Sequence, residues 1–251
     1  MSFSPTRSLA AAAGLAMATA SLAACAPSSS AHGLAVVATT TQVCDYVTQI
    51  AARSADISLD KTDAAGKSSH VGAPADGAAL TMSLTCLLAP NASAHEHEMT
   101  PAQTSALAQA DVMAVSGVDL EHFLDDAVVS SGFKGRMIVT SGVLTAADID
   151  NPGTPDPEGA YTIDRGSERV DVAPWPFPPE EAGEEPEFRF DPHVWTSPKG
   201  ARVQIANLGA GLAAAAPDAA SSINAATASY LEEIDALDQW TAEAIETVPE
   251  G

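Results

Sequence analysis

The stretch GLAVVATTTQVCDYVTQIAAR, residues 33–53, decides the fold. Its first half is a continuous apolar run that ends in threonines, a pattern typical of a strand buried in a parallel sheet. Its second half has apolar residues at helical spacing, namely Val43, Tyr46, Val47 and Ile50. A buried strand followed at once by an amphipathic helix predicts the first unit of an α/β domain.

The same alternation continues along the chain. Further strands are expected over residues 80–90, 111–117 and 136–142. Helices are expected between them, over residues 100–110 and 118–132. The sequence therefore predicts an α/β fold with a mostly parallel sheet and helices on both faces. Ligands of such sheets bind at the carboxyl ends of the strands.

Two segments interrupt this pattern within a lobe that spans residues 34–216. Residues 54–79 are rich in Ser, Asp, Gly and Ala, and we expect a surface insertion there. Residues 145–190 are rich in Pro and acid and contain no histidine, so we expect a partly disordered insert that is dispensable for metal binding. A connecting helix is expected over residues 217–248. Its length of ~48 Å would carry it beyond the sheet.

The N-terminus has the pattern of an export signal. Residues 1–24 contain a single charge, Arg7, followed by an apolar run that is too short and too alanine-rich to span a membrane. Leu-Ala-Ala-Cys, residues 22–25, resembles the bacterial lipobox, in which the cysteine carries lipid; the alternative is an ordinary cleaved signal with a coincidental cysteine. Residues 25–33 would form a flexible tether. We expect an extracytoplasmic protein, anchored through Cys25 to the outer face of the bacterial cell membrane.

The charge balance limits the partners. The chain has 33 acidic and 11 basic residues, which gives a formal net charge of −22 at pH 7. Such a surface repels DNA, RNA and anionic membranes, so no nucleic-acid partner is expected. Most of this charge is best explained by solubility, because it far exceeds what one cation site needs.

Two further cysteines, Cys44 and Cys86, follow Cys25 in the sequence. They fall on the first expected helix and the second expected strand, which are neighbours in a βαβ unit. Outside the cytoplasm they can form a disulfide. The alternative is a pair of buried thiols. The separation of the two Cα atoms, which the sequence does not give, distinguishes a disulfide from free thiols.

Two histidines are candidate metal ligands. His95 lies in NASAHEHEM, directly after the second expected strand, and His193 lies in FRFDPHVWTSPKGA, residues 188–201. Neutral imidazole is a common ligand of zinc and similar metals, and Asp191 could orient His193. Neither spacing is a zinc-finger or H-E-x-x-H pattern. On these residues alone, solvated loop histidines remain the alternative.

The order of these segments resembles the metal-binding lipoproteins of ABC importers for zinc and manganese, the cluster of solute-binding proteins with a rigid connecting helix. The similar pieces are the lipobox, LAVVATTTQVCDYV, LLAPNASAHEHEMTPAQ, ALAQADVMAVSGVDLEHFL, DPHVWTSPKGARVQIANLGAGLAAAAPD and NAATASYLEEIDALD. The resemblance implies the N-terminal lobe of a periplasmic-binding-protein-like fold, followed by the long helix. It also implies that His95 and His193 are metal ligands.

The same resemblance bears on the other histidines. His97 stands where the family often has an aromatic residue, and it could be an auxiliary ligand. Glu98 matches a common acid of the family motif, and we expect it to serve the loop structure. His32, His70 and His122 match nothing and are expected to be surface residues.

The implied function is capture of Zn²⁺ or Mn²⁺ and delivery to an ABC permease and its ATPase. Family members continue into a second lobe that supplies two further ligands. No such lobe is expected within residues 1–251, so a truncated, non-transporting fragment is one alternative. An adhesin-like surface lipoprotein of the same fold is another. A metal hydrolase would need a third ligand and a general base that the sequence does not reveal, so no enzyme is expected.

Overall fold

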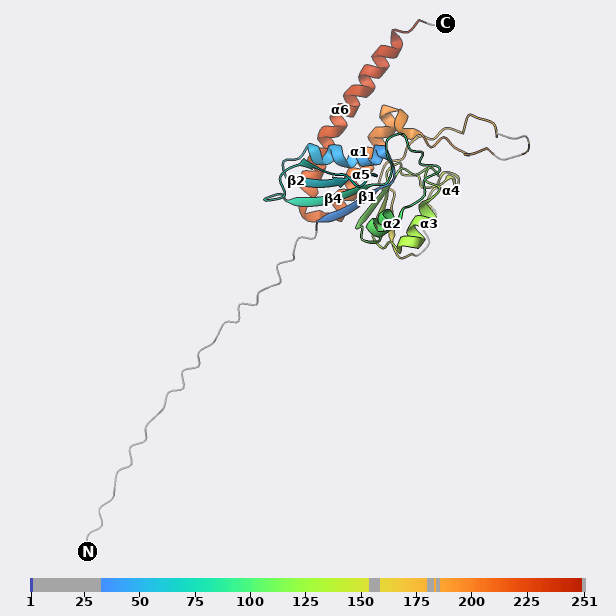
Figure 1. Ribbon diagram of the computed structural model, residues 1–251. Coiled ribbons are helices and arrows are strands. Elements are labelled where there is room, and N and C mark those ends of the chain that lie inside the picture. Colours follow the sequence, from blue (N-terminus) through green and yellow to red (C-terminus); the bar gives the residue numbers. More distant parts are fainter. Residues whose placement is uncertain (2–32, 154–158, 180–182, 184–185, 250–251) are drawn as a thin grey trace. The chain divides into compact units, whose positions relative to one another are not determined.

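The computed structural model describes residues 1, 33–153, 159–179, 183 and 186–249 (Figure 1). The fold below is that of the compact unit Gly33–Gly251. The expected signal peptide, the lipobox with Cys25, and His32 all lie outside the described residues. Among the described helices, none has the length and apolar character needed to cross a membrane.

Seven strands of the described chain form one sheet, in the order β3-β2-β4-β1-β5-β6-β7. Their bounds are β1 Leu34–Ala38, β2 Ile57–Thr62, β3 Ser68–Gly72, β4 Leu80–Cys86, β5 Val112–Val115, β6 Arg136–Val139 and β7 Thr162–Asp164. Strands β2 and β3 pair antiparallel, and the other neighbours pair in parallel. The mostly parallel sheet predicted from the sequence is therefore confirmed.

Helices cover both faces of this sheet (Figure 1). Their bounds are α1 Thr41–Ala52, α2 Pro101–Ala108, α3 Leu124–Ser131, α4 Ala146–Asp150, α5 Pro198–Ala215 and α6 Ala220–Glu246, with 3-10 turns at Val194–Thr196 and Pro217–Ala219. Helices α1, α5 and α6 pack on one face, and α2 and α3 pack on the other.

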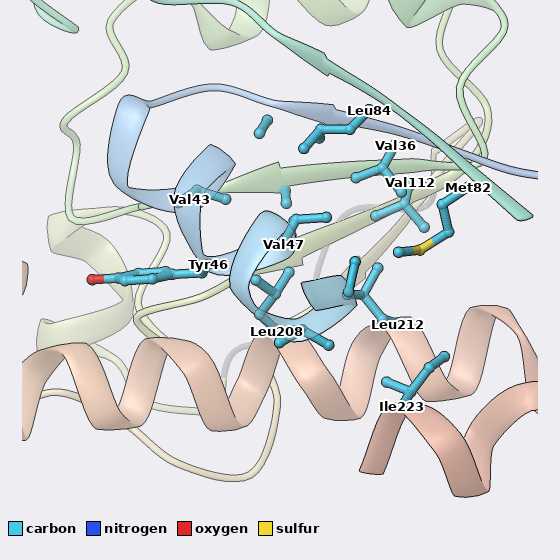
Figure 2. Close-up of a cluster of buried hydrophobic side chains, with 14 of the residues drawn as sticks. Val36, Val43, Tyr46, Val47, Met82, Leu84, Val112, Leu208, Leu212 and Ile223 are labelled. Carbon is cyan, nitrogen blue, oxygen red and sulfur yellow. The ribbon is translucent and has the colours of Figure 1, made fainter. Parts of the chain in front are cut away.

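Alternation along the strands divides the core between the two faces. Val36 of β1 faces α1 and α5, whereas the next residue, Val37, packs in the cluster on the opposite face. Figure 2 shows the first cluster, in which Leu208 and Leu212 of α5 lie beneath the sheet. Burial of each such side chain stabilises the fold by about 1.5–3 kcal/mol.

Residues 54–79 are not the surface insertion that the sequence suggested. They contain β2 and β3, and Ile57 and Leu59 of β2 are fully buried between β4 and helix α1. The segment was missed because ISLDKT is short and mixes apolar with charged residues. Part of the 145–190 segment also belongs to the sheet, since β7 pairs with β6.

Helix α3 begins at Leu124, later than the predicted start at residue 118. The preceding residues Val118 and Asp119 have positive φ angles of 60° and 56°. Their amides donate to the carbonyls of Val143 and Leu144, at 2.8 and 3.0 Å, in the loop after β6. These cross-loop bonds replace the first helical turn.

Helix α6 leaves the sheet, as its length predicts. Ile223, Ala226 and Tyr230 in its first half are buried. Further along, Leu237 and Trp240 are exposed, with 45% and 64% of their surface accessible. The second half of α6 therefore makes little contact with the lobe (Figure 1).

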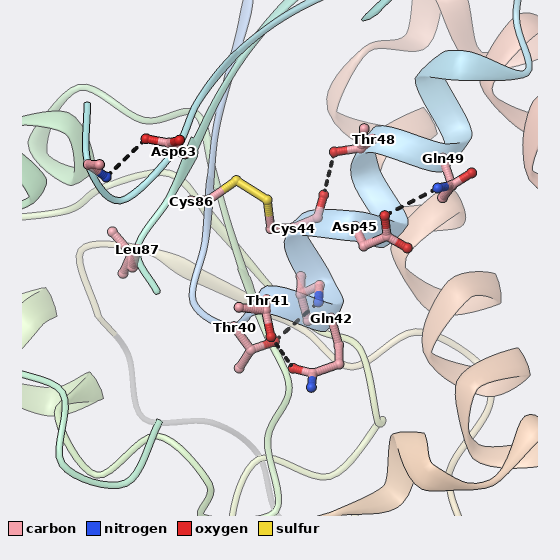
Figure 3. The surroundings of a disulfide bond; sticks show 12 residues. Thr40, Thr41, Gln42, Cys44, Asp45, Thr48, Gln49, Asp63, Cys86 and Leu87 are labelled. Atoms are coloured by element: carbon pink, nitrogen blue, oxygen red, sulfur yellow. Dashed lines mark hydrogen bonds between the residues drawn. A yellow bond between two sulfur atoms is a disulfide. The ribbon is translucent and has the colours of Figure 1, made fainter. Parts of the chain in front are cut away.

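Cys44 and Cys86 form a disulfide, with Cα atoms 5.6 Å apart (Figure 3). The bond joins α1 to the end of β4, and both residues are buried. The side chain of Thr40 caps α1 by accepting a hydrogen bond from the amide of Val43 at 3.1 Å. The disulfide therefore links two elements next to the carboxyl edge of the sheet.

Candidate metal centre

His193 is held in place by Asp191. One carboxylate oxygen, Oδ1, accepts a hydrogen bond from the backbone amide of His193 at 3.0 Å and lies 2.7 Å from its ring Nδ1. Directly behind it, Ser197 and Pro198 start helix α5. If Nδ1–H donates to Asp191, Nε2 keeps its lone pair, which is the arrangement in which histidine binds metals.

His95 lies on the loop between β4 and α2, across from His193. The centroids of the two rings are 5.6 Å apart. Nδ1 of His95 is buried and has no hydrogen-bond partner among the residues that the structure describes. Such unpartnered buried polar atoms are rare in proteins and call for an explanation. Coordination of a metal ion by the lone pair of this nitrogen would explain why it has no other partner.

The loop that carries His95 is anchored at both ends by Gln103. The Gln103 side chain accepts from the amide of Thr100 at 2.9 Å and donates to the carbonyl of Leu87 at 2.7 Å. Thr100 in turn accepts from the amide of Gln103 at 3.3 Å, which completes a capping box at the start of α2. The buried amide therefore ties the loop to the end of β4.

The surroundings of His95 favour its neutral form. Burial lowers the pKa of His95 below its ordinary value, because a charged ring is less well solvated there. The nearby rings of His193 and His122 act in the same direction. The carboxylate of Glu187 and the backbone of Leu120 oppose this shift. A neutral imidazole is the form that coordinates metal.

His122 is exposed, as expected, but it does not lie apart from the other histidines. Its ring centroid is 5.9 Å from that of His95. It follows β5, which is separated in the sheet from β4 only by β1. The sequence placed His95 on a loop after a strand and His122 on the helix expected over residues 118–132, and their proximity depends on this strand order.

An aromatic wall backs the histidines. Phe188, which is 4% exposed, has its ring 4.8 Å from His95 and 5.4 Å from His122, measured between centroids. Trp175 packs on Phe188 at 5.0 Å and on His193 at 5.9 Å. Both aromatic residues belong to the 145–190 segment. The sequence did not indicate them, because the apolar residues of this segment are few among its many Pro and acidic residues.

His97 points elsewhere. Its ring packs edge-on against Phe123 at 4.9 Å, beside α3, and its Nε2 is buried without a hydrogen-bond partner in the described part of the chain. Burial lowers the pKa of His97, while a hydrogen bond with Gln103 opposes that shift. Glu98 is exposed on the same loop. His70 lies on β3, where Nδ1 contacts Asp60 at 3.0 Å.

A buried carboxylate fixes the backbone beside His122. Glu121 accepts hydrogen bonds from the hydroxyl of Thr39 at 2.6 Å and from the amides of Ser116 and Gly117 at 2.6 and 3.0 Å. Burial raises the pKa of Glu121, and these three donors oppose the shift. The carboxylate ties the ends of β1 and β5 together.

As the side chains are placed, no three His, Cys, Asp or Glu groups among the described residues are arranged to hold a metal ion. His95 and His193 are therefore a pair of imidazoles rather than a closed site. Zinc takes four ligands in tetrahedral sites. Two imidazoles would leave coordination positions for water or for other protein groups.

Several solved structures share this fold. The chain resembles Zn(II)-bound AdcA from Streptococcus pneumoniae with a TM-score of 0.54 and 18% identity, over 86% of this chain and 33% of AdcA. It resembles a zinc-bound deletion mutant of ZnuA with a TM-score of 0.55 and 16% identity, over 87% and 60% of the two chains. It resembles a Mn-bound mutant of a periplasmic metal-binding protein from Candidatus Liberibacter asiaticus with a TM-score of 0.51 and 17% identity. That match covers 85% of this chain and 57% of the other.

The chain thus spans between 33% and 60% of the lengths of these structures. The family described as ZnuA, zinc-uptake complex component A, periplasmic, matches residues 75–251, which is most of the chain. This match contains both the His95 loop and the His193 loop. The chain belongs to the ZnuA family of periplasmic zinc-uptake complex components.

Proposed function

We propose that this protein captures a divalent transition metal ion, Zn²⁺ or Mn²⁺, outside the cytoplasm. The observation that carries the proposal is the pairing of His95 with His193. Nδ1 of His95 is buried without a partner among the described residues. The ring of His193, oriented by Asp191, has its centroid 5.6 Å from that of His95. Two imidazoles so placed can share one ion.

The chemistry is coordination without bond cleavage. The ion would exchange part of its water shell for imidazole nitrogens and would keep or replace the remaining waters as further ligands become available. Nitrogen donors favour zinc over manganese, because affinity at such sites follows the Irving–Williams order and manganese prefers oxygen. The family is a transport component, which supports a carrier rather than an enzyme.

The partners follow from the family description, which names an uptake complex. We propose that the loaded protein is recognised by the permease of an ABC importer, which its ATPase drives. We also propose that Cys25, outside the described residues, carries a lipid that holds the protein at the membrane. Radiolabelled palmitate should enter the wild-type chain but not Cys25→Ser, and equal labelling would contradict the anchor.

Calorimetry with Zn²⁺ and Mn²⁺ near neutral pH tests the metal site. Each single change, His95→Ala or His193→Ala, should weaken binding strongly, and the double variant should lose little more than either one. The reason is that one remaining ligand of a shared site holds the ion poorly. Independent surface histidines would instead give small, additive losses. His70→Ala, on β3, is the matched control and should bind as the wild type does.

Wild-type affinity in the His95→Ala, His193→Ala double variant would overturn the proposed metal site. Far-ultraviolet circular dichroism of each variant checks that the fold is intact. Because both side chains are only partly buried, neither substitution is expected to unfold the lobe.

A further inference from the structure

The ring of His122 lies beside those of His95 and Phe188, at the candidate site. Its ring is 5.9 Å from His95 and 5.4 Å from Phe188, measured between centroids. Phe188 also contacts His95 at 4.8 Å and His193 at 6.5 Å. One buried phenyl ring therefore touches all three imidazoles, which gather around it from three separate loops.

The spacing of the rings matches that of ligands to a common ion. Two imidazoles bound to one tetrahedral zinc, with Zn–N distances of about 2.0–2.1 Å, have ring centroids roughly 5 Å apart. The measured separations are 5.6 Å for His95 with His193 and 5.9 Å for His95 with His122. The ring of His95 therefore lies at nearly the distance of a co-ligand from both His193 and His122.

We propose that His122 is a third imidazole ligand of the captured ion, so that this lobe alone offers three nitrogen donors. The inference rests on the proposed function. A three-nitrogen set leaves one tetrahedral position open for water or another group. It also strengthens the preference for zinc over manganese, because each added imidazole favours the metal that accepts nitrogen more readily.

The rings must turn before three nitrogens converge, because no triad is closed in the placement described. His122 is exposed, and rotation of an exposed side chain between rotamers takes picoseconds to nanoseconds. Its backbone, by contrast, is fixed. The neighbouring Glu121 is buried and is bonded to the amides of Ser116 and Gly117. The ion would therefore select a rotamer on a loop that is already in position.

The test measures Zn²⁺ affinity of the full chain by competition with a chromogenic chelator, for wild type, His122→Ala, His122→Asn, His95→Ala and His193→Ala. We expect both His122 variants to bind about 10- to 100-fold more weakly than wild type, at least the loss seen when the partner of a ligand is removed. His70→Ala, which removes another exposed imidazole, should bind as wild type does.

Nuclear magnetic resonance of the histidine ring nitrogens supplies a second readout on the wild-type chain. On titration with Zn²⁺, one ring nitrogen of His122 should shift together with those of His95 and His193. If His95→Ala and His193→Ala lose affinity while His122→Ala does not and its ring nitrogens stay unshifted, His122 is not a ligand and the two-imidazole site stands. If none of the three substitutions weakens binding, the proposed function itself fails.

Discussion

Asp191 orients His193 with a single carboxylate oxygen, which accepts from the backbone amide at 3.0 Å and lies 2.7 Å from ring Nδ1. The two contacts close a tight turn and fix the direction of the ring. A carboxylate at this position also makes the opposite nitrogen a better donor to a metal. The Asp-Pro-His sequence is therefore a device for presenting Nε2 at one point.

Asp191→Ala should weaken Zn²⁺ binding by about 10- to 100-fold, because the ring loses both its orientation and its carboxylate partner. Calorimetry measures the change. Asp171 is an exposed residue that lines the same pocket as Asp191 and His193, so Asp171→Ala is the matched control. Equal losses in the two variants would mean that general charge, rather than orientation of His193, sets the affinity.

Zn²⁺ binding should weaken as the solution is acidified. A protonated imidazole has no lone pair, so protons compete with the metal below the pKa of each ligand. Burial lowers the pKa of His95, so this ligand stays neutral to a lower pH than a free histidine with a pKa near 6.5. Affinity should be level near pH 7.5 and should fall below about pH 6. Affinity that is constant down to pH 5 would argue against imidazole ligands.

The sequence predicted the central sheet because its strands are long apolar runs with clear helices between them. It did not predict β7, which has three residues in a segment dominated by Pro and acid. Short strands carry too few residues for a periodic pattern, and their pairing depends on neighbours far along the chain. The cover of one face by α5 and α6 likewise emerges only when the whole lobe packs.

The candidate site divides in the same way. His95 and His193 were predicted as ligands from the resemblance carried by their two loops, whose residues are adjacent in sequence. His122 and Phe188 join them only through packing, since they come from the loops after β5 and before α5. Charge and composition do not indicate that these loops lie next to each other. The strand order that places the loops after β4 and β5 near each other was the missing information.

Loss of the disulfide should reduce stability without changing metal affinity. Cys44 and Cys86 are 42 residues apart, and closing a loop of this length is worth about 4 kcal/mol in the chain-entropy model. Urea unfolding should show a lower free energy for the Cys44→Ala, Cys86→Ala variant than for wild type. Dithiothreitol should lower the stability of wild type but not of the variant. A change in Zn²⁺ affinity on reduction would contradict a purely structural role.

Phe188 should matter for both stability and metal binding. Its ring is 4% exposed and lies 4.8 Å from His95 and 5.4 Å from His122. Phe188→Ala should cost about 3 kcal/mol of unfolding free energy, because it leaves a cavity behind the imidazoles. Rings that lose this support must be ordered again when the ion binds, at about 0.5–1.5 kcal/mol each, so affinity should fall roughly 10-fold.

Because deleting residues 145–190 would also remove Phe188 and its ring contacts with His95 and His122, we now predict that the deletion weakens metal binding. Phe177→Ala is the matched control, because that ring is 61% exposed and packs on Trp175 rather than on a histidine. Phe188→Leu, which keeps most of the volume, should restore a large part of both losses. If Phe188→Ala lowers stability but binds Zn²⁺ as tightly as Phe177→Ala does, the wall serves the fold alone. The histidines would then be held by their own loops.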